Sequence, residues 1–285
     1  WRGLAIDQAG SADLDWLLLS DSGYEWGIGI VKSLTGNLAM DHCSITNCNS
    51  NGLVVNANNS GAITVTNCSF QNCGGNGVSV ANNSGSVSLL NSSLSSNGNA
   101  GLNTSAPVTM TGCTLSNNTG YGVYMTGLYL PGLPSNTITG NGTAGIGING
   151  ATISVDTPWP KEIGPYRILN NVSVAEGSTL TVSPGVTVSA EHYQGLFVHG
   201  TLNAVGTQAL PIIFTGTSSN AGWWRGVRME NGSNAELQYC SFLYGGYEYG
   251  INLLKTGTGT ITAQNCSFSH GSGNGIRIEG GASTV

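Results

Sequence analysis

Short runs of alternating apolar and polar residues recur along the whole chain. Ile63-Thr64-Val65 and Val78-Ser79-Val80 are two of them. Alternation with a period of two predicts β-strands that bury one face. Gly, Asn and Ser separate the runs, and these residues tolerate tight turns and left-handed backbone. Because helical periodicity is missing from this pattern, we expect an all-β chain.

The alternating runs align into columns that recur every roughly 21–26 residues, within the range of solenoid repeats. The clearest apolar column is Ile45, Phe70, Leu94, Leu115 and Ile138. A second column starts with Cys48 and Cys73 and continues as Asn97, Asn118 and Asn141, which predicts a ladder of hydrogen-bonded amides. A period of this length with short strands is typical of a parallel β-helix, a solenoid whose successive coils lie about 4.8 Å apart. At roughly 23 residues per coil, we expect about 12 coils.

A second, longer repeat is superimposed on the short one. Residues 1–62 align without a gap to residues 224–285, with 18 identities in 62 pairs. This predicts a 223-residue tandem repeat, with the C-terminal part of one unit at 1–157 and the N-terminal part of the next at 158–285. We place the seam near 150–165, where three of the eight prolines occur. The chain starts at Trp1, without Met, so we interpret it as a window cut from a larger repeat protein.

Composition and charge narrow the possible partners. Charged residues are 8% of the chain, against roughly 25% in typical globular domains. The eight basic residues are scattered and the net charge is −6, so we expect no nucleic-acid partner. No apolar run approaches the roughly 18 residues of a membrane span, so we expect no span in this segment.

Several motifs resemble a known family. Val174–Val182, Pro184–Val186, Gly200–Ala204 and Trp224–Val227 resemble the opening of right-handed parallel β-helix domains in large secreted microbial surface proteins. Runs such as Asn67-Cys68-Ser69-Phe70 resemble the repeats of the pectate-lyase-like superfold. The resemblance covers nearly the whole chain and implies a right-handed, single-stranded parallel β-helix. It leaves the activity open, because that superfold hosts enzymes, adhesins and inert spacers.

Catalysis in such folds needs clustered carboxylates. The resemblance implies Asp residues around calcium with a basic residue nearby, or two carboxylates that flank a glycosidic bond. Asp13 and Asp15 are the only close Asp pair, and the second copy has Glu236 and Gln238 in their places. We interpret the pair as a solvated strand face. We therefore expect no enzymatic site, no metal site and no cofactor.

Aromatic residues in glycine-flanked turns are better candidates for binding. Tyr24 and Trp26 in the first copy match Tyr247 and Tyr249 in the second, where Tyr244 lies close by. Exposed aromatic rings can stack on sugars or bury against a partner. A local cover over the helix wall, without any ligand, is the alternative interpretation.

Cysteines and sequons bear on the cellular compartment. Three pairs are expected on adjacent coils, close enough for disulfides, with stacked free thiols as the alternative: Cys43 with Cys68, Cys48 with Cys73, and Cys240 with Cys266. Ten N-x-S/T sequons occur, at Asn58, Asn67, Asn82, Asn91, Asn103, Asn117, Asn141, Asn171, Asn231 and Asn265. They permit N-glycosylation of an extracellular protein, although an Asn- and Ser-rich chain also forms sequons by chance.

These observations favour an extracellular or cell-surface structural protein. We expect a tandem-repeat β-helix rod that forms a fibre, stalk or adhesin shaft on a microbial surface. Its expected partners are further copies of itself, head to tail, with glycans as a further candidate. The alternative is a polysaccharide-binding or polysaccharide-cleaving β-helix protein. Ice binding by threonine arrays is a third class, but the Thr-x-Thr motifs do not recur coil after coil.

Overall fold

The computed structural model describes residues 2–22, 27–82, 85–127, 135–280 and 283–284. They form an all-β parallel solenoid of about 11 turns, which confirms the predicted fold class. One short 3-10 helix, η1 (Lys161–Ile163), is the only helix in these ranges. The chain divides into two compact units, Trp1–Ile146 and Gly147–Val285. Strand β18 (Thr143–Ile153) contains the boundary between them.

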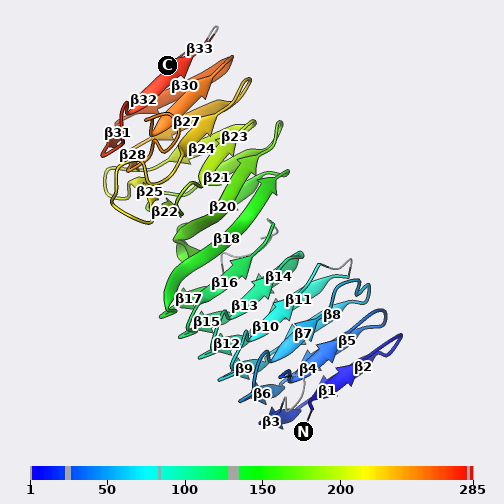
Figure 1. The fold of residues 1–285 in the computed structure, drawn as a ribbon. Helices are drawn as coiled ribbons and strands as arrows, with labels where there is room; N and C mark the ends of the chain where they lie inside the picture. Colours follow the sequence, from blue (N-terminus) through cyan, green and yellow to red (C-terminus); the bar gives the residue numbers. More distant parts are fainter. Residues whose placement is uncertain (1, 23–26, 83–84, 128–134, 281–282, 285) are drawn as a thin grey trace. The chain divides into compact units, whose positions relative to one another are not determined.

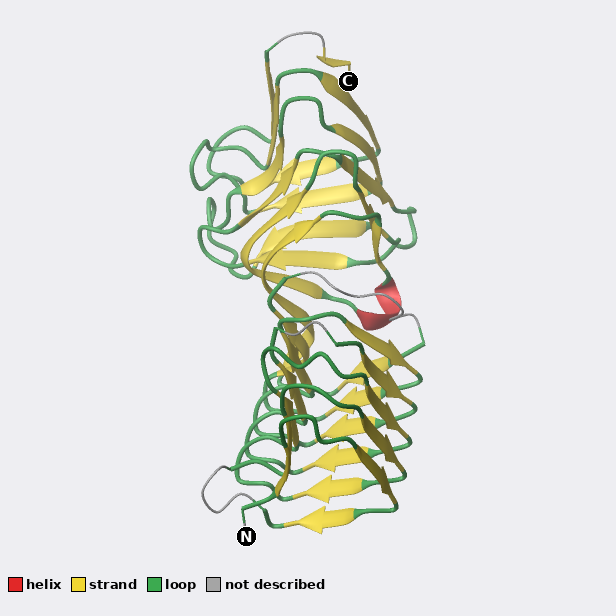
Figure 2. Cartoon of the chain, turned by 90° about the vertical axis from the view of Figure 1, so that its right-hand side faces the viewer, coloured by secondary structure: helices red, strands yellow, loops and turns green. Residues whose placement is uncertain are grey.

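Unit 1 consists of three rows of short parallel strands, which Figure 2 shows stacked coil upon coil. The first row contains β1 (Leu4–Ile6), β4 (Ile30–Lys32), β7 (Leu53–Val55), β10 (Val78–Val80), β13 (Leu102–Thr104) and β16 (Tyr121–Met125). The second row contains β2 (Ala12–Asp15), β5 (Leu38–Asp41), β8 (Ile63–Thr66), β11 (Val87–Leu90) and β14 (Val108–Thr111). The third row contains β3 (Leu18–Ser20), β6 (Ser44–Thr46), β9 (Ser69–Gln71), β12 (Ser93–Ser95), β15 (Thr114–Ser116) and β17 (Thr137–Thr139).

The strand register of unit 1 stacks apolar residues of one coil on apolar residues of the next. The predicted apolar column is a continuous ladder in which Ile45 pairs with Phe70, and the pairing continues through Leu94 and Leu115 to Ile138. The first four of these side chains are fully buried. Alternate residues of each strand point outward, as the buried–exposed–buried pattern of β8 illustrates. A single coil cannot enclose an apolar interior, so the stacking of coils produces the core.

Unit 2 has the same architecture with longer strands (Figure 1). One row contains β19 (Thr157–Trp159), β21 (Thr179–Val182), β24 (Thr201–Val205), β27 (Asn234–Gln238), β30 (Gly259–Gln264) and β33 (Ser283–Thr284). Another contains β20 (Tyr166–Val174), β23 (Gly195–Val198), β26 (Gly226–Met229), β29 (Leu253–Thr256) and β32 (Ile276–Glu279). The first residues of β20 also pair with a third row, formed by β22 (Thr187–Ala190), β25 (Ile212–Gly216), β28 (Cys240–Leu243) and β31 (Ser267–Ser269).

Aromatic stacking reinforces unit 2 along the direction in which its coils stack. The rings of Phe214, Phe242 and Phe268 lie in register on β25, β28 and β31, with centroids 4.9 Å apart at each step. Trp159 and Tyr166, both fully buried, stack at 4.7 Å. Near-parallel rings at these spacings contribute beyond the area that they bury.

The long sequence repeat reappears as a repeat of strands. When residue 1 is aligned with residue 224, the seven strands β1 to β7 coincide, in the same order, with the seven strands β26 to β32. The bounds agree within two residues at every strand end. Two stretches with 18 identities in 62 pairs thus adopt the same succession of strands. The division of the chain into tandem units at 157/158 stays a prediction.

Candidate functional site

The most extended polar feature of unit 1 is an asparagine ladder. Asn97 donates from Nδ2 to Asn118 Oδ1 at 2.9 Å, and Asn118 donates in the same way to Asn141 Oδ1 at 2.9 Å. Each amide oxygen also accepts the backbone N–H of the residue one coil earlier, at 3.0 to 3.1 Å. Asn97 and Asn118 are buried with their polar atoms paired. The predicted ladder is therefore confirmed, and its role is structural, because it satisfies backbone groups at a corner.

Each unit also buries a lysine. Lys32 and Lys255 are fully buried and occupy the same position of the long repeat. The Lys32 ammonium donates to the carbonyl oxygens of Ser33 and Thr35 at 2.7 and 2.6 Å. Burial lowers the pKa of both lysines below the ordinary value, while a nearby carboxylate, Asp7 or Glu230, partly opposes this pKa shift. Since both ammonium groups face backbone oxygens inside the solenoid, they are structural and not available to a substrate.

Acidic residues meet at one exposed corner of unit 1. Asp15 and Asp41 are register partners on β2 and β5, and His42 Nδ1 lies 3.0 Å from Asp41 Oδ1. One ligand atom from each of the three lies within 4.8 Å of the others, a spacing that could hold a metal ion. Asp13 does not belong to this group, although the sequence paired it with Asp15. The ring of Trp16 stacks on His42 at 4.4 Å, because both residues occupy successive left-handed corner positions.

An aromatic cluster lies at the surface of unit 2. His192 is stacked between Tyr193 and Trp223, with ring centroids 3.5 and 4.3 Å away. Tyr247 leans against Tyr193 at 4.1 Å with an interplanar angle of 55°. Tyr193 and Tyr247 are each 44% exposed, so their rings present apolar faces beside hydroxyl groups to solvent. We refer to His192, Tyr193, Trp223 and Tyr247 as the aromatic cluster.

Polar contacts hold the aromatic cluster in place. Trp223 donates from Nε1 to Thr217 Oγ1 at 3.0 Å, and Thr217 donates to Glu191 Oε2 at 3.0 Å. Glu191 in turn pairs with the guanidinium of Arg167 on β20. Because the rings are braced from beneath, they form a pre-arranged surface.

The predicted aromatic residues have different surroundings. Tyr247 joins the aromatic cluster, whereas Tyr249 lies under Arg228, whose guanidinium carbon is 5.0 Å from the ring centroid. Tyr244 is half-buried against His270 at 5.1 Å. Tyr24 and Trp26 lie outside the described residues. Sequence reasoning noted Trp223 beside Trp224 but missed His192 and Tyr193 as members of the surface; the adjacent aromatic residues at 192 and 193 were the available signal.

The six cysteines of the predicted pairs are all thiols in the structure. Their pairing as disulfides stays a prediction. The backbone N–H of Cys43 donates to Cys68 Sγ at 3.4 Å. A hydrogen bond from Cys73 lowers the pKa of Cys48 to about 7, and one from Cys240 lowers the pKa of Cys266 to about 6. Burial raises the pKa of Cys68 to about 12. Cys266 is half-buried, and the other five are buried.

Most of the sequon asparagines are accessible. Asn103 and Asn141 are half-buried, and Asn141 belongs to the asparagine ladder. The exposed ones are Asn58, Asn67, Asn82, Asn91, Asn117, Asn171, Asn231 and Asn265. These eight have the exposure that glycosylation requires.

Comparisons with known proteins agree with this geometry. A family model described as "Right handed beta helix region" matches residues 22–157. Over 64 residues, the chain is 38% identical to Protein bark beetle of Drosophila melanogaster, an alignment that covers 22% of this chain and 2% of that protein. The chain thus spans a very small part of this curated relative. No solved structure matches the chain.

The stacked parallel strands, together with the family match over residues 22–157, show a right-handed parallel β-helix fold, consistent with the pectate-lyase-like superfold. The matched family includes enzymes and non-enzymes, so the match assigns no catalytic role. The described residues contain no helix with the length and hydropathy needed to cross a membrane.

Proposed function

We propose that this chain is a segment of an extracellular or cell-surface structural protein, in which tandem β-helix units form a stalk, fibre or adhesin shaft. The observation that carries the proposal is the correspondence of β1 through β7 with β26 through β32 in the long repeat. A succession of strands repeated within one chain favours extension by further units. Further copies, in the same chain or joined head to tail, would cover the exposed strand edges of a terminal coil.

The interior chemistry supports a mechanical role. Hydrogen-bonded amides, stacked phenyl rings and the backbone-bound Lys255 join one coil to the next. Among the described residues, the one group of three potential metal ligands is Asp15, Asp41 and His42, at an exposed corner of the solenoid. Eight exposed sequon asparagines suit a glycosylated extracellular protein. Because the curated relative is an insect protein, the proposal is not restricted to a microbial source.

Electron microscopy of the native full-length protein tests the proposal. One 223-residue unit at roughly 23 residues per coil and about 4.8 Å per coil advances by about 45 Å. We expect an unbranched filament or stalk with an axial repeat near that value. Compact isolated particles without such a repeat would contradict the proposal.

Glycan binding is a second candidate function, favoured by the aromatic cluster. Flat, exposed rings with hydroxyl groups, braced by partly buried polar contacts, resemble the platforms on which sugars stack. A glycan array tests it, with Tyr193→Ala and Tyr247→Ala expected to abolish binding. Tyr124→Ala, on β16 of unit 1, is the matched control. Binding that survives both cluster variants, or no binding at all, would exclude this function.

A further inference from the structure

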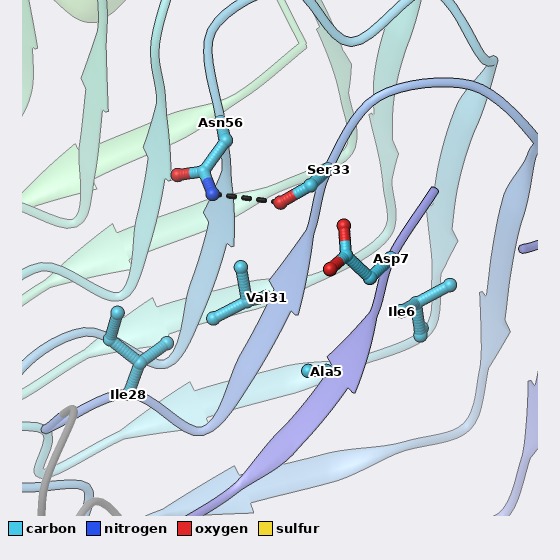
Figure 3. Close-up of a pocket in the computed structure, with 7 residues that line it drawn as sticks. All are labelled: Ala5, Ile6, Asp7, Ile28, Val31, Ser33 and Asn56. Carbon is cyan, nitrogen blue, oxygen red and sulfur yellow. Dashed lines mark hydrogen bonds between the residues drawn. The ribbon is translucent and has the colours of Figure 1, made fainter. Parts of the chain in front are cut away.

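A hollow lies on the outer face of the first strand row of unit 1. It has a volume of about 460 Å³ and is lined by Ala5, Ile6, Asp7, Ile28, Val31, Ser33 and Asn56. Figure 3 shows the Asp7 carboxylate, the Ser33 hydroxyl and the Asn56 amide along one side, with Ala5, Val31 and Ile28 along the other. Asn56 donates from Nδ2 to Ser33 Oγ at 2.8 Å. The hollow therefore has an apolar floor and a polar edge.

The long repeat gives this hollow a counterpart in unit 2. Ala5, Asp7 and Val31 correspond to Arg228, Glu230 and Leu254. Ala5 pairs with Val31 in the register of β1 and β4, and Arg228 pairs with Leu254 in the register of β26 and β29. The two outer faces are thus directly comparable, and an alanine replaces an arginine at the centre of the hollow.

In unit 2 the arginine occupies the equivalent surface. Arg228 Nε lies 2.7 Å from Glu230 Oε1, and Arg228 Nη1 donates to Tyr249 Oη at 3.2 Å. Its neighbour in register, Leu254, is only 5% exposed. In unit 1, Val31 at the same place is half-buried. Unit 2 therefore shows which group this surface accepts: a guanidinium over an aliphatic floor, paired with a carboxylate.

The carboxylate in unit 1 is available for such a group. Asp7 Oδ1 accepts the backbone N–H of Gln8 at 2.7 Å, and across the ranges that the structure describes it makes no ion pair with an arginine or lysine. Lys32 lies nearby, but its ammonium is buried and donates to backbone carbonyls. Trp26, the counterpart of Tyr249, lies outside the described residues. The hollow thus combines a negative edge with an apolar floor.

We propose that this hollow is a binding site for an arginine side chain of a protein partner. The guanidinium takes the place that Arg228 fills in unit 2, with its charge against Asp7 and its flat face over Val31 and Ala5. A planar, weakly hydrated cation suits this combination better than an ammonium does. The site is independent of whether the protein forms a fibre, so the two proposals can fail separately.

NMR titration of the full chain with Nα-acetyl-arginine-amide tests the site. We expect saturable shifts of the methyl signals of Ile6, Ile28 and Val31. Nα-acetyl-norleucine-amide, which keeps an aliphatic chain and lacks the charge, should bind at least about tenfold more weakly. Asp7→Asn should weaken arginine binding roughly fivefold, as expected for the loss of one partly exposed ion pair. Equal affinity for the two probes, or no shifts at these methyls, would overturn the proposal.

A second variant tests the comparison between the units. Ala5→Arg introduces the residue of unit 2 and should abolish binding of the probe, because its own side chain fills the hollow. Ser79→Arg, on the outward face of β10 in the same strand row, is the matched control and should leave binding unchanged. If Ala5→Arg bound the probe as tightly as the unaltered protein, the hollow would not be the binding site.

Discussion

Lys32 and Lys255 occupy the same position of the long repeat, and each places its ammonium among backbone oxygens inside the solenoid. Lys255 has the larger set of acceptors: the carbonyls of Glu230, Thr256 and Thr258 and the hydroxyl of Ser233. Lys32 contacts the equivalents of Thr256 and Thr258, namely Ser33 and Thr35. In both units the lysine thus joins the end of its strand to the turn that follows.

Replacing either lysine by methionine should destabilise the protein, and Lys255→Met should cost more. Methionine keeps the aliphatic volume but leaves buried acceptors unpaired, at about 1–3 kcal/mol for each unsatisfied group. Chemical denaturation of the protein, followed with a probe specific to each unit, measures the free energy of unfolding. The fluorescence of the buried Trp224 is such a probe for unit 2. Equal or improved stability of Lys255→Met would show that the carbonyl cage contributes nothing.

The lysines also predict a pH dependence of stability. Their folded-state pKa lies below the value of about 10.5 expected for the unfolded chain, so the folded state releases protons first as the pH rises. Stability should therefore increase with pH between the folded-state pKa and about 10.5. Comparing the unaltered protein with the double variant Lys32→Met/Lys255→Met isolates this contribution. If the two show the same slope above neutral pH, the prediction is wrong.

Asn118→Ala should break the asparagine ladder at its centre. It removes the bonds to Asn97 and Asn141 and the bond from Nδ2 to the Leu94 carbonyl at 3.0 Å. We expect a loss of about 2–4 kcal/mol, since several buried groups lose partners together. The urea midpoint measures it, with the half-buried, outward Asn103→Ala as the control. A loss no greater than that of the control would contradict the ladder's role.

Cys266 should be the most reactive thiol once the protein has been mildly reduced. It is half-buried while the other six thiols are buried, and the hydrogen bond from Cys240 lowers its pKa to about 6. Its alkylation rate should therefore rise with a midpoint near pH 6, instead of the usual value of about 8.5. Mass spectrometry after iodoacetamide treatment locates the modified residue.

Cys240→Ala is the informative variant for this thiol. Removing the donor should move the alkylation midpoint of Cys266 to higher pH while leaving its exposure similar. A midpoint near 8.5 in the unaltered protein, or an unchanged midpoint in the variant, would disprove the pairing.

Much of the fold could be predicted from the repeat spacing, because residues one repeat apart in the sequence of a solenoid lie next to each other on adjacent coils. The interval from Ile45 to Phe70 defined a ladder, and that from Asn97 to Asn118 defined an amide pair. Surface contacts were harder to foresee. Asp15 meets Asp41 one coil away and not Asp13 two residues away, since alternate residues on one face of a strand are farther apart than register partners on adjacent coils.

The buried lysines illustrate a different limit. Alternation in Ile30-Val31-Lys32 places Lys32 on the same inward face as Ile30, so the signal was present. Burial of a charged group nonetheless depends on carbonyls that only the folded turn brings together. The aromatic cluster was only partly foreseen for a similar reason: Tyr247 was predicted as an exposed ring, but its place in one cluster with Tyr193 and Trp223 depends on three separate turns that only the fold brings together.

The coils differ in length, yet their strands remain in register. Val87 pairs in register with Val108, whereas Leu38 pairs with Ile63 across a longer stretch of chain, and both pairings continue over four residues. The corners therefore absorb additions and deletions without shifting the pairing of strands. A foreign peptide grafted into a longer corner, such as 57–61, would be displayed at the surface on a rigid support. The same tolerance would let related proteins acquire new recognition loops while their scaffold stays unchanged.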